Sequence, residues 1–173
     1  MHIRLLIATP DQASLALLQS VVNATQDLTC FTVTAAAAAS YETLMQQVDA
    51  AAADVILLDW EMGKTTTADL VREILTHNPR MRTVVLLPSH QRQYRQLVWE
   101  AGACNSIPKE YVEQEWLSSI LCVMVRAIQR EARLRAEYEN QVAIEDIFDQ
   151  SGACPVEDWP QRKQSATPKN INN

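Results

Sequence analysis

Short apolar runs alternate along the chain with longer stretches in which apolar residues recur every three or four positions. The short runs predict buried strands at residues 3–8, 28–35, 55–58, 83–87 and 104–107. The longer stretches predict helices from Asp11 to about Ala24, from Ser40 to Ala53, from Thr67 to near Asn78 and from about Val112 onward, and the first residue of each of the first three is a candidate N-cap. The polar stretch from Gln91 to Ala101 is predicted as one more helix, with Gly102 at its C′ position. Because strands and helices alternate strictly, we expect an α/β fold with a doubly wound, five-stranded parallel sheet.

The end of the chain differs in composition from the predicted sheet. Apolar residues of the last helix give way to interleaved arginine and glutamate, and prolines follow further on. We therefore expect a domain over residues 1–128, a helical extension over 129–150 and a flexible tail over 151–173. The charged extension is interpreted either as a solvated helix or as a contact with a partner or a second copy, through Tyr138 and Phe148.

Charge and composition exclude several classes of function. The 173 residues carry 15 Lys+Arg and 21 Asp+Glu, a net charge of −6, which argues against binding nucleic acid or an anionic membrane. Only three glycines occur, so the chain has no glycine-rich phosphate loop. The four cysteines form no CxxC pair, and no apolar stretch is long enough to span a bilayer. We expect a cytoplasmic protein.

Candidate chemistry lies where ligands gather in such sheets, at the carboxyl ends of the strands. Asp11 follows the first predicted strand, Asp59 the third, Pro88 and Ser89 the fourth, and Lys109 the fifth. The acidic and basic side chains of this set could form an ion pair, accept a group, or, as a third alternative, act as a small catalytic site. We expect no enzymatic activity.

Three stretches at these strand ends resemble the receiver domain of bacterial response regulators over the whole predicted domain. They are residues 54–62, 84–87 with the loop that follows, and 102–109. The resemblance implies a flavodoxin-like receiver fold. It also implies that Asp59 stands at the phospho-acceptor position and that Lys109 stands where the family's lysine pairs with the phosphate.

The family's metal site is altered in this sequence. A pair of acidic residues follows the first strand in the family, but that place matches Thr9 and Pro10 here, with Asp11 one step further on. Magnesium prefers carboxylate oxygens, so the resemblance leaves Asp11, Asp59 and Glu61 as a weak ligand set. Asp11 is also a good N-cap for the first helix.

The positions that relay the signal in the family are altered as well. Pro88 stands where the switch hydroxyl is expected, with Ser89 adjacent to it, and Ser106 stands where the aromatic switch residue is expected. Glu110 replaces the proline after the lysine, while Pro108 precedes the lysine. Proline offers neither a hydroxyl nor a backbone N–H to a phosphate.

The resemblance and its departures together predict a stand-alone receiver-like signalling protein that acts through protein–protein interaction, with weak or no phosphorylation. The alternative is a response regulator phosphorylated on Asp59 by a histidine kinase, with Mg²⁺ as cofactor only in that case. We expect a protein partner at Trp99, Tyr138 and Phe148, such as a histidine kinase or another signalling protein, and a homodimer through the final helix. We expect no binding to nucleic acid or to a membrane.

Overall fold

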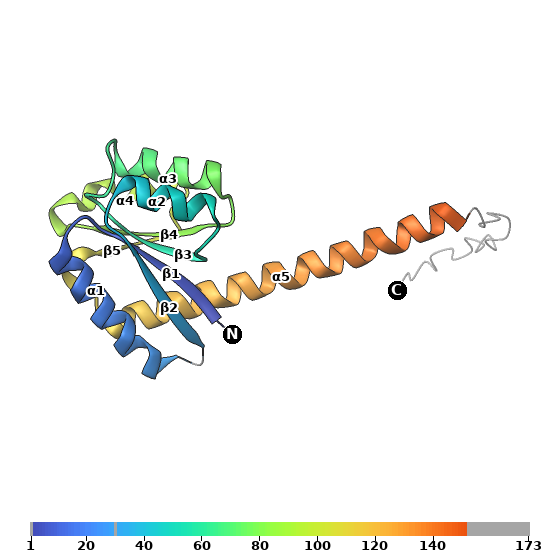
Figure 1. Cartoon of the computed structure of the whole chain (residues 1–173), viewed down its shortest axis with the longest axis horizontal. Coiled ribbons are helices and arrows are strands. Elements are labelled where there is room, and N and C mark those ends of the chain that lie inside the picture. The colour runs from blue at the N-terminus through green and yellow to red at the C-terminus, as the bar shows by residue number, and fades with distance from the viewer. Residues whose placement is uncertain (1, 30, 152–173) are drawn as a thin grey trace, which may run out of the picture. The chain divides into compact units, whose positions relative to one another are not determined.

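The computed structural model describes residues 2–29 and 31–151, and the side chains of residues 142–151 lie outside the description. Five parallel strands form one sheet in the order β2-β1-β3-β4-β5 (Figure 1). The strands are β1 His2–Ala8, β2 Thr32–Ala38, β3 Val55–Asp59, β4 Arg82–Leu87 and β5 Asn105–Pro108. The predicted α/β fold with a five-stranded parallel sheet is confirmed. The predicted contact at Phe148 and the tail beyond Ser151 lie outside the described residues.

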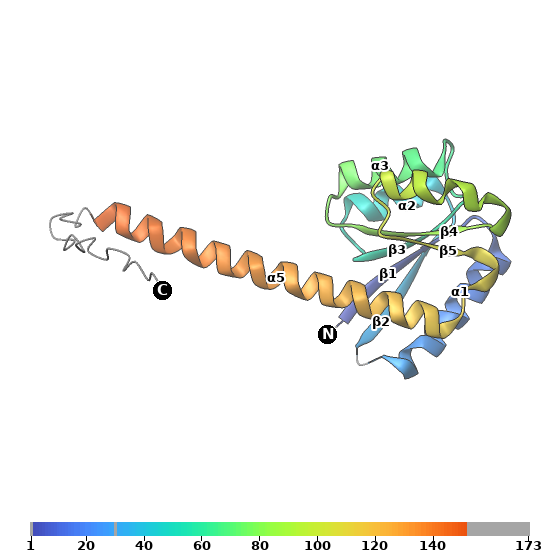
Figure 2. The ribbon, with the colours of Figure 1, turned by 180° about the vertical axis from the view of Figure 1, so that it is seen from behind.

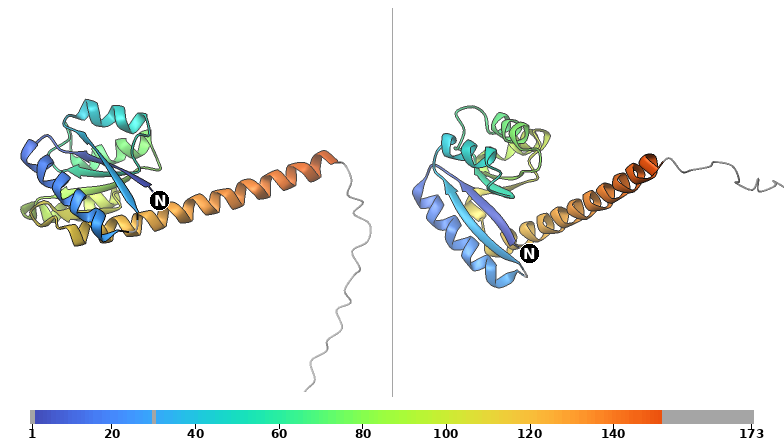
Figure 3. Two further views of the ribbon diagram at one scale, coloured as in Figure 1. Left: turned by 60° about the horizontal axis from the view of Figure 1, so that its bottom comes forward. Right: turned by 45° about the vertical axis from the view of Figure 1, so that its right-hand side comes forward.

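Helices cover both faces of the sheet (Figures 1 and 2). The α-helices are α1 Gln12–Thr25, α2 Tyr41–Asp49, α3 Thr67–His77, α4 Arg95–Glu100 and α5 Gln114–Ser151. Three short 3-10 helices join them: η1 Gln26–Leu28, η2 Ser89–Tyr94 and η3 Lys109–Tyr111. The two views of Figure 3 show α1 and the start of α5 against one face of the sheet, opposite α2 and α3.

Two hydrophobic clusters, one on each face, hold the layers together. Alternate residues of a strand point to opposite faces, so β3 sends Ile56 and Leu58 toward α2, α3 and α4, and Val55 and Leu57 toward α1 and α5. All four side chains are fully buried. Burial of each such aliphatic side chain stabilises the fold by roughly 1.5–3 kcal/mol. The all-apolar strand lies at the centre of the sheet.

Side-chain caps determine where three helices begin. Asp11 and Ser40 cap α1 and α2 as predicted, each accepting a hydrogen bond from the backbone N–H three residues on. The prediction for α3 was one residue off, because the cap is Thr66 and not Thr67. The Thr67 hydroxyl instead donates to the carbonyl oxygen of Trp60 at 2.9 Å.

The second strand begins later than the sequence predicts. Residues 28–35 were expected to form it, but β2 is Thr32–Ala38 and Leu28 ends η1. Every residue of β2 pairs with one of β1, from Thr32 opposite His2 to Ala38 opposite Ala8. This backbone pairing carries the alanines into the strand despite their weak preference for it.

The predicted helix from Gln91 to Ala101 is also wrong in its first half. Residues 89–94 form the 3-10 helix η2, and the α-helix α4 covers only Arg95–Glu100. None of the side chains of η2 is buried, and Val98 alone is buried in α4. Without an apolar face to bury, this segment gains little from packing as a regular α-helix. The turn after α4 holds Gly102 at φ +105°, as its predicted C′ position requires.

The chain divides into two compact units, Met1–Gln129 and Arg130–Asn173. The first unit contains the sheet and both clusters. The described side chains of the second unit, residues 130–141, are all exposed. None of the described helices is long and apolar enough to cross a lipid bilayer.

Candidate functional site

The carboxyl ends of the central strands bring one buried carboxylate together with a lysine and a threonine. Asp59 is the last residue of β3, and its side chain has no exposed surface. Thr9 directly follows β1, the neighbouring strand, and Lys109 directly follows β5. The sheet topology therefore assembles residues that are 50 positions apart in the sequence.

Each oxygen of the Asp59 carboxylate already has a partner. Oδ2 accepts a hydrogen bond from Thr9 Oγ1 at 2.7 Å and lies 2.8 Å from Lys109 Nζ. Oδ1 accepts a hydrogen bond from the backbone N–H of Glu61 at 3.2 Å. A buried charge is tolerated when it is paired and hydrogen-bonded in this way.

Lys109 completes the charge balance of the site. Its side chain is 23% exposed and also lies 3.8 Å from Glu61 Oε2. Burial acts to lower the pKa of Lys109, but the hydrogen bond and the charge of Asp59, with Glu61 and Asp11 adding to them, raise it above its ordinary value. The ammonium group is therefore held in its charged form beside Asp59. The ion pair that the sequence analysis considered for these two residues is present.

The carboxylate of Asp11, which lies shortly after β1, binds the start of α1 instead of this site. Asp11 Oδ2 accepts hydrogen bonds from the backbone N–H of Ser14 at 2.7 Å and from Ser14 Oγ at 2.6 Å. These bonds, the largest cause, lower the pKa of Asp11. Its own backbone N–H donates to Thr9 Oγ1 at 3.3 Å. The carboxylate thus caps α1 while the backbone supports the Thr9 hydroxyl.

We asked whether these residues fit a magnesium ion. In the described part of the chain, no three His, Cys, Asp or Glu side chains come together as a metal-binding group. Thr9 donates a hydrogen bond to Asp59 where a carboxylate ligand would be needed, and the side chain of Glu61 is 62% exposed. Magnesium requires a near-octahedral shell of oxygen ligands. The donor set of this structure does not fit such a site.

The hydroxyl beside the site is bound by a carboxylate of the protein. Ser89 donates its backbone N–H to both carboxylate oxygens of Glu110, at 3.1 and 3.0 Å, and its hydroxyl to Oε2 at 2.9 Å. Hydrogen bonds from the backbone N–H of Glu110 itself and from Ser89 lower the pKa of Glu110. We call this pair the Ser89–Glu110 clamp. It joins the start of η2, just after β4, to η3.

A second polar contact lies in β5, where Ser106 stands at the position at which the family has an aromatic switch residue. Ser106 is buried, and its Oγ accepts a hydrogen bond from Arg95 Nε at 3.0 Å. Arg95 also donates to the Ser106 carbonyl oxygen at 3.4 Å and lies 5.3 Å from the ring centre of Trp99. The arginine links α4 to β5.

The remaining predicted positions are dispersed. Pro88 is buried at the end of β4, and Trp60 stacks on Tyr94 of η2 with ring centres 5.4 Å apart. The predicted partner contacts Trp99 and Tyr138 are 47% and 67% exposed. Their roles stay predictions.

Two partners at the site were missed by the sequence analysis. Thr9 was noted only because it stands where the family has an acidic residue, and its hydrogen bond to Asp59 was not predicted. Arg95 belonged to a segment without an apolar pattern. The one available signal of an altered contact was Glu110, which follows Lys109 where the family has a proline. Its contact with Ser89 depends on how two loops meet, which hydrophobic periodicity does not report.

Comparison with known proteins assigns the fold to a family. The sequence matches the response regulator receiver domain over residues 5–121. No curated protein matches the chain.

Solved structures show the same fold. The chain is similar to a response regulator receiver domain protein from Clostridium thermocellum, with 22% identity, a TM-score of 0.59, and coverage of 76% of this chain and 98% of the other. A CheY-like receiver domain protein from Methanospirillum hungatei has 16% identity and a TM-score of 0.60, and the match covers 75% of this chain and 99% of the other. The receiver domain of a sensor histidine kinase from Pseudomonas aeruginosa holds a magnesium ion in its active-site cleft. It has 15% identity and a TM-score of 0.58, and the match covers 70% of this chain and 95% of the other.

Proposed function

Since this chain belongs to the response regulator receiver domain family, we propose that it is a two-component signalling protein that recognises a protein partner without a phosphoryl group on Asp59. The proposal rests on the contacts of that carboxylate, which Lys109 at 2.8 Å and Thr9 at 2.7 Å already satisfy. On this proposal the domain is a cytoplasmic binding module and has no catalytic turnover.

The Ser89–Glu110 clamp supports the same proposal. A receiver domain needs a hydroxyl that can move to an arriving phosphoryl group, and a serine next to the fourth strand is the candidate here. Its hydroxyl and backbone N–H both bind the Glu110 carboxylate. Charge-assisted hydrogen bonds of this kind are about twice as strong as neutral ones. Ser89 therefore already has an anionic partner, the Glu110 carboxylate, without phosphorylation of Asp59.

One observation favours the alternative function, a phosphorylation switch driven by a histidine kinase. Asp59 and Lys109 keep the arrangement of an acceptor carboxylate beside an ammonium group. The similar domain from Pseudomonas aeruginosa holds magnesium in its active-site cleft. In this chain the carboxylates of Asp11, Asp59 and Glu61 would have to turn toward a shared ion, and Asp11 would leave its cap.

A fluorescence titration separates the two functions. Trp60 directly follows Asp59 and contacts Tyr94 of η2, so its emission should respond to a change at the site. The protein is titrated with MgCl₂ and then with beryllofluoride. Four proteins are compared: wild type, Asp59→Asn, Pro10→Asp and Pro10→Asn. The two Pro10 variants differ only in the charge that one of them adds at the acidic position.

We expect no saturable change in wild type, Asp59→Asn or Pro10→Asn. Pro10→Asp should gain a response to magnesium, because the added carboxylate supplies a ligand that the donor set lacks. A saturable wild-type response that is lost in Asp59→Asn would overturn the proposed function and establish the phosphorylation switch. Repeating the titration on Trp60→Phe assigns the signal to that indole.

We further propose that residues 1–128 form the signalling module and that residues 129–150 extend its last helix. Leu134 and Tyr138 are 52% and 67% exposed and lie four positions apart on α5, hence on one face of the helix. We propose this face as a contact between two copies. Sedimentation of wild type and Tyr138→Glu tests the contact, and a wild-type monomer would contradict it.

A further inference from the structure

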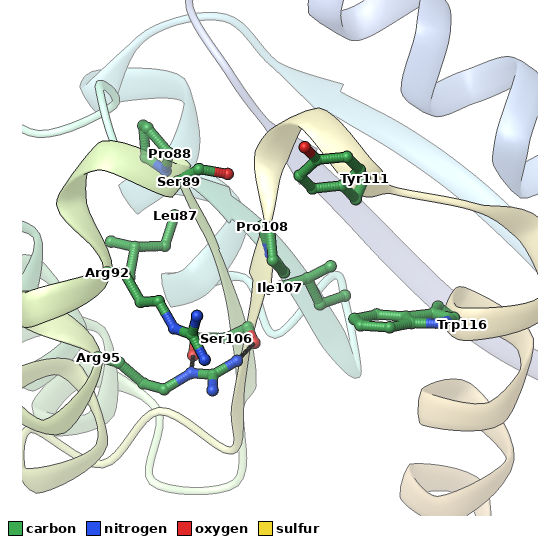
Figure 4. A pocket seen from close by; sticks show the side chains of 10 residues that line it. All are labelled: Leu87, Pro88, Ser89, Arg92, Arg95, Ser106, Ile107, Pro108, Tyr111 and Trp116. Carbon is green, nitrogen blue, oxygen red and sulfur yellow. Dashed lines mark hydrogen bonds between the residues drawn. The ribbon is translucent and has the colours of Figure 1, made fainter.

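A cavity of about 380 Å³ opens beside the edge strand β5. Its walls come from the end of β4, from η2 and α4, and from the first turn of α5 (Figure 4). Arg92 and Arg95 reach into it from one side, and Trp116 lies on the other. We call it the Arg92–Trp116 cavity.

The small side chain of Ser106 leaves room for the cavity. Serine at this buried position fills little volume, and the long side chain of Arg95 crosses toward it to form its hydrogen bond. Figure 4 draws both arginine side chains on the Ser106 side of the cavity, with Trp116 across from them. Both positive charges therefore lie at one wall.

Neither of these arginines has an acidic partner in the described part of the chain. Arg95 donates only to Ser106 and lies against Trp99, and no hydrogen bond or ion pair joins the Arg92 guanidinium to a carboxylate. The protein has six more acidic than basic residues, yet none of the described acids pairs here. Like charges three residues apart repel each other, and a bound carboxylate would remove that repulsion.

The rest of the cavity lining is mostly apolar and aromatic. Leu87 and Ile107 contribute buried aliphatic surface, while Tyr111 and Trp116 are 62% and 52% exposed. Exposed aromatic side chains that flank a cavity are typical anchors for a partner side chain. The cavity therefore pairs two unneutralised cations with a surface for one apolar group.

We propose that the Arg92–Trp116 cavity docks an acidic peptide segment of a partner protein. Carboxylates of the segment pair with Arg92 and Arg95, and one apolar or aromatic side chain packs against Tyr111 and Trp116. The proposal rests on the proposed function, because it names the chemistry of the partner. A protein of net charge −6 repels acidic peptides overall, so binding of one requires a local site.

The test uses a short fluorescein-labelled peptide in which aspartate and glutamate flank one phenylalanine. Its binding to the full chain is followed by fluorescence anisotropy. Arg92→Glu is compared with Arg80→Glu, which makes the same charge change on an exposed arginine just before β4, at the opposite end of that strand. A peptide with lysine in place of every acid is the control for the ligand.

We expect the acidic peptide to bind wild type and Arg80→Glu alike. Arg92→Glu should weaken binding by roughly tenfold or more, the loss expected for one charge-assisted contact. Trp116→Ala should weaken it too, and added salt should weaken binding to wild type. Equal weakening by both arginine variants, equal binding of the lysine peptide, or full displacement by inorganic phosphate would overturn the docking proposal.

The same assay separates failure of this inference from failure of the proposed function. Binding that is equal in wild type and Asp59→Asn, with or without magnesium and beryllofluoride, supports both. Binding that requires beryllofluoride would overturn the proposed function and leave the docking cavity standing. Absence of peptide binding under every condition would overturn the cavity proposal alone.

Discussion

Two buried threonines allow a direct measurement of what holds the site together. Thr9 and Thr83 are 1% and 0% exposed. The Thr9 hydroxyl donates to the Asp59 carboxylate at 2.7 Å, whereas Thr83 Oγ1 is the one buried side-chain polar atom of the described residues with no hydrogen-bond partner. Thr→Val keeps the shape of the side chain and removes only the hydroxyl. The same substitution should therefore have opposite effects at the two positions.

The magnitudes follow from the hydrogen-bonding partners. A hydrogen bond to a charged group contributes about 1.5–3 kcal/mol, so Thr9→Val should destabilise the protein by about 2 kcal/mol. The Asp11 backbone N–H also loses its acceptor in that variant, which adds to the cost. An unpaired buried hydroxyl costs about 1–3 kcal/mol, so Thr83→Val should raise stability by about 1 kcal/mol. β4 also favours valine as a strand residue.

Urea unfolding at neutral pH, followed by circular dichroism, measures both changes. With a slope of about 2 kcal/mol per molar urea, the midpoint should fall by about 1 M for Thr9→Val and rise by about 0.5 M for Thr83→Val. Slopes that match wild type are required for this comparison. A wild-type midpoint for Thr9→Val, or equal losses for both variants, would refute the reasoning about the Asp59 carboxylate.

Three further predictions follow from contacts of the first unit. Lys109→Met leaves Asp59 buried without its cation and should cost about 3 kcal/mol in urea unfolding. Because the pKa of Lys109 is raised, its stabilisation is complete below the ordinary lysine pKa and disappears above the raised value. The two proteins should therefore converge in Tm at strongly alkaline pH, and a constant gap would contradict the ion pair. The pKa of Glu110 is lowered, so the Ser89 contact should persist above the ordinary glutamate pKa and be lost as pH falls through the lowered value. The amide NMR shift of Ser89 should follow this loss in wild type but not in Glu110→Gln. Gly102→Ala places a Cβ 2.4 Å from a leucine side chain of α3 at φ +105° and should cost about 1–3 kcal/mol, whereas an unchanged thermal midpoint would show that the turn relaxes.

The parts of the fold that the sequence predicted best are those dictated by burial. The run Val55 to Leu58 is apolar at every position, and only a strand covered on both faces can bury all four side chains. The caps Asp11 and Ser40 were predicted because their hydrogen bonds reach only three residues along the chain. Local patterns of this kind are visible without knowing the fold.

The parts that failed depend on contacts between distant segments. The start of β2 is determined by its pairing with β1, and η2 forms where polar side chains have no face to bury. The position of Asp59 at a strand end was predictable, but Thr9 and Lys109, which contact its Oδ2, directly follow two other strands. Likewise, Glu110 was noticed as a departure from the family, and only the meeting of two loops reveals that it binds Ser89.

The altered positions of the site have a common physical consequence. To accept a phosphoryl group, Asp59 would have to exchange its hydrogen bonds with Thr9 and Lys109, each worth about 1.5–3 kcal/mol. To report that group, Ser89 would have to leave the Glu110 carboxylate, which already supplies the anion. On this proposal, a change at Asp59 gains little that the resting structure lacks, because the Ser89 hydroxyl through which it would act already donates to the Glu110 carboxylate. On the proposed function, the affinity for a partner is then determined by the Arg92–Trp116 cavity itself, whose residues do not contact the Asp59 carboxylate.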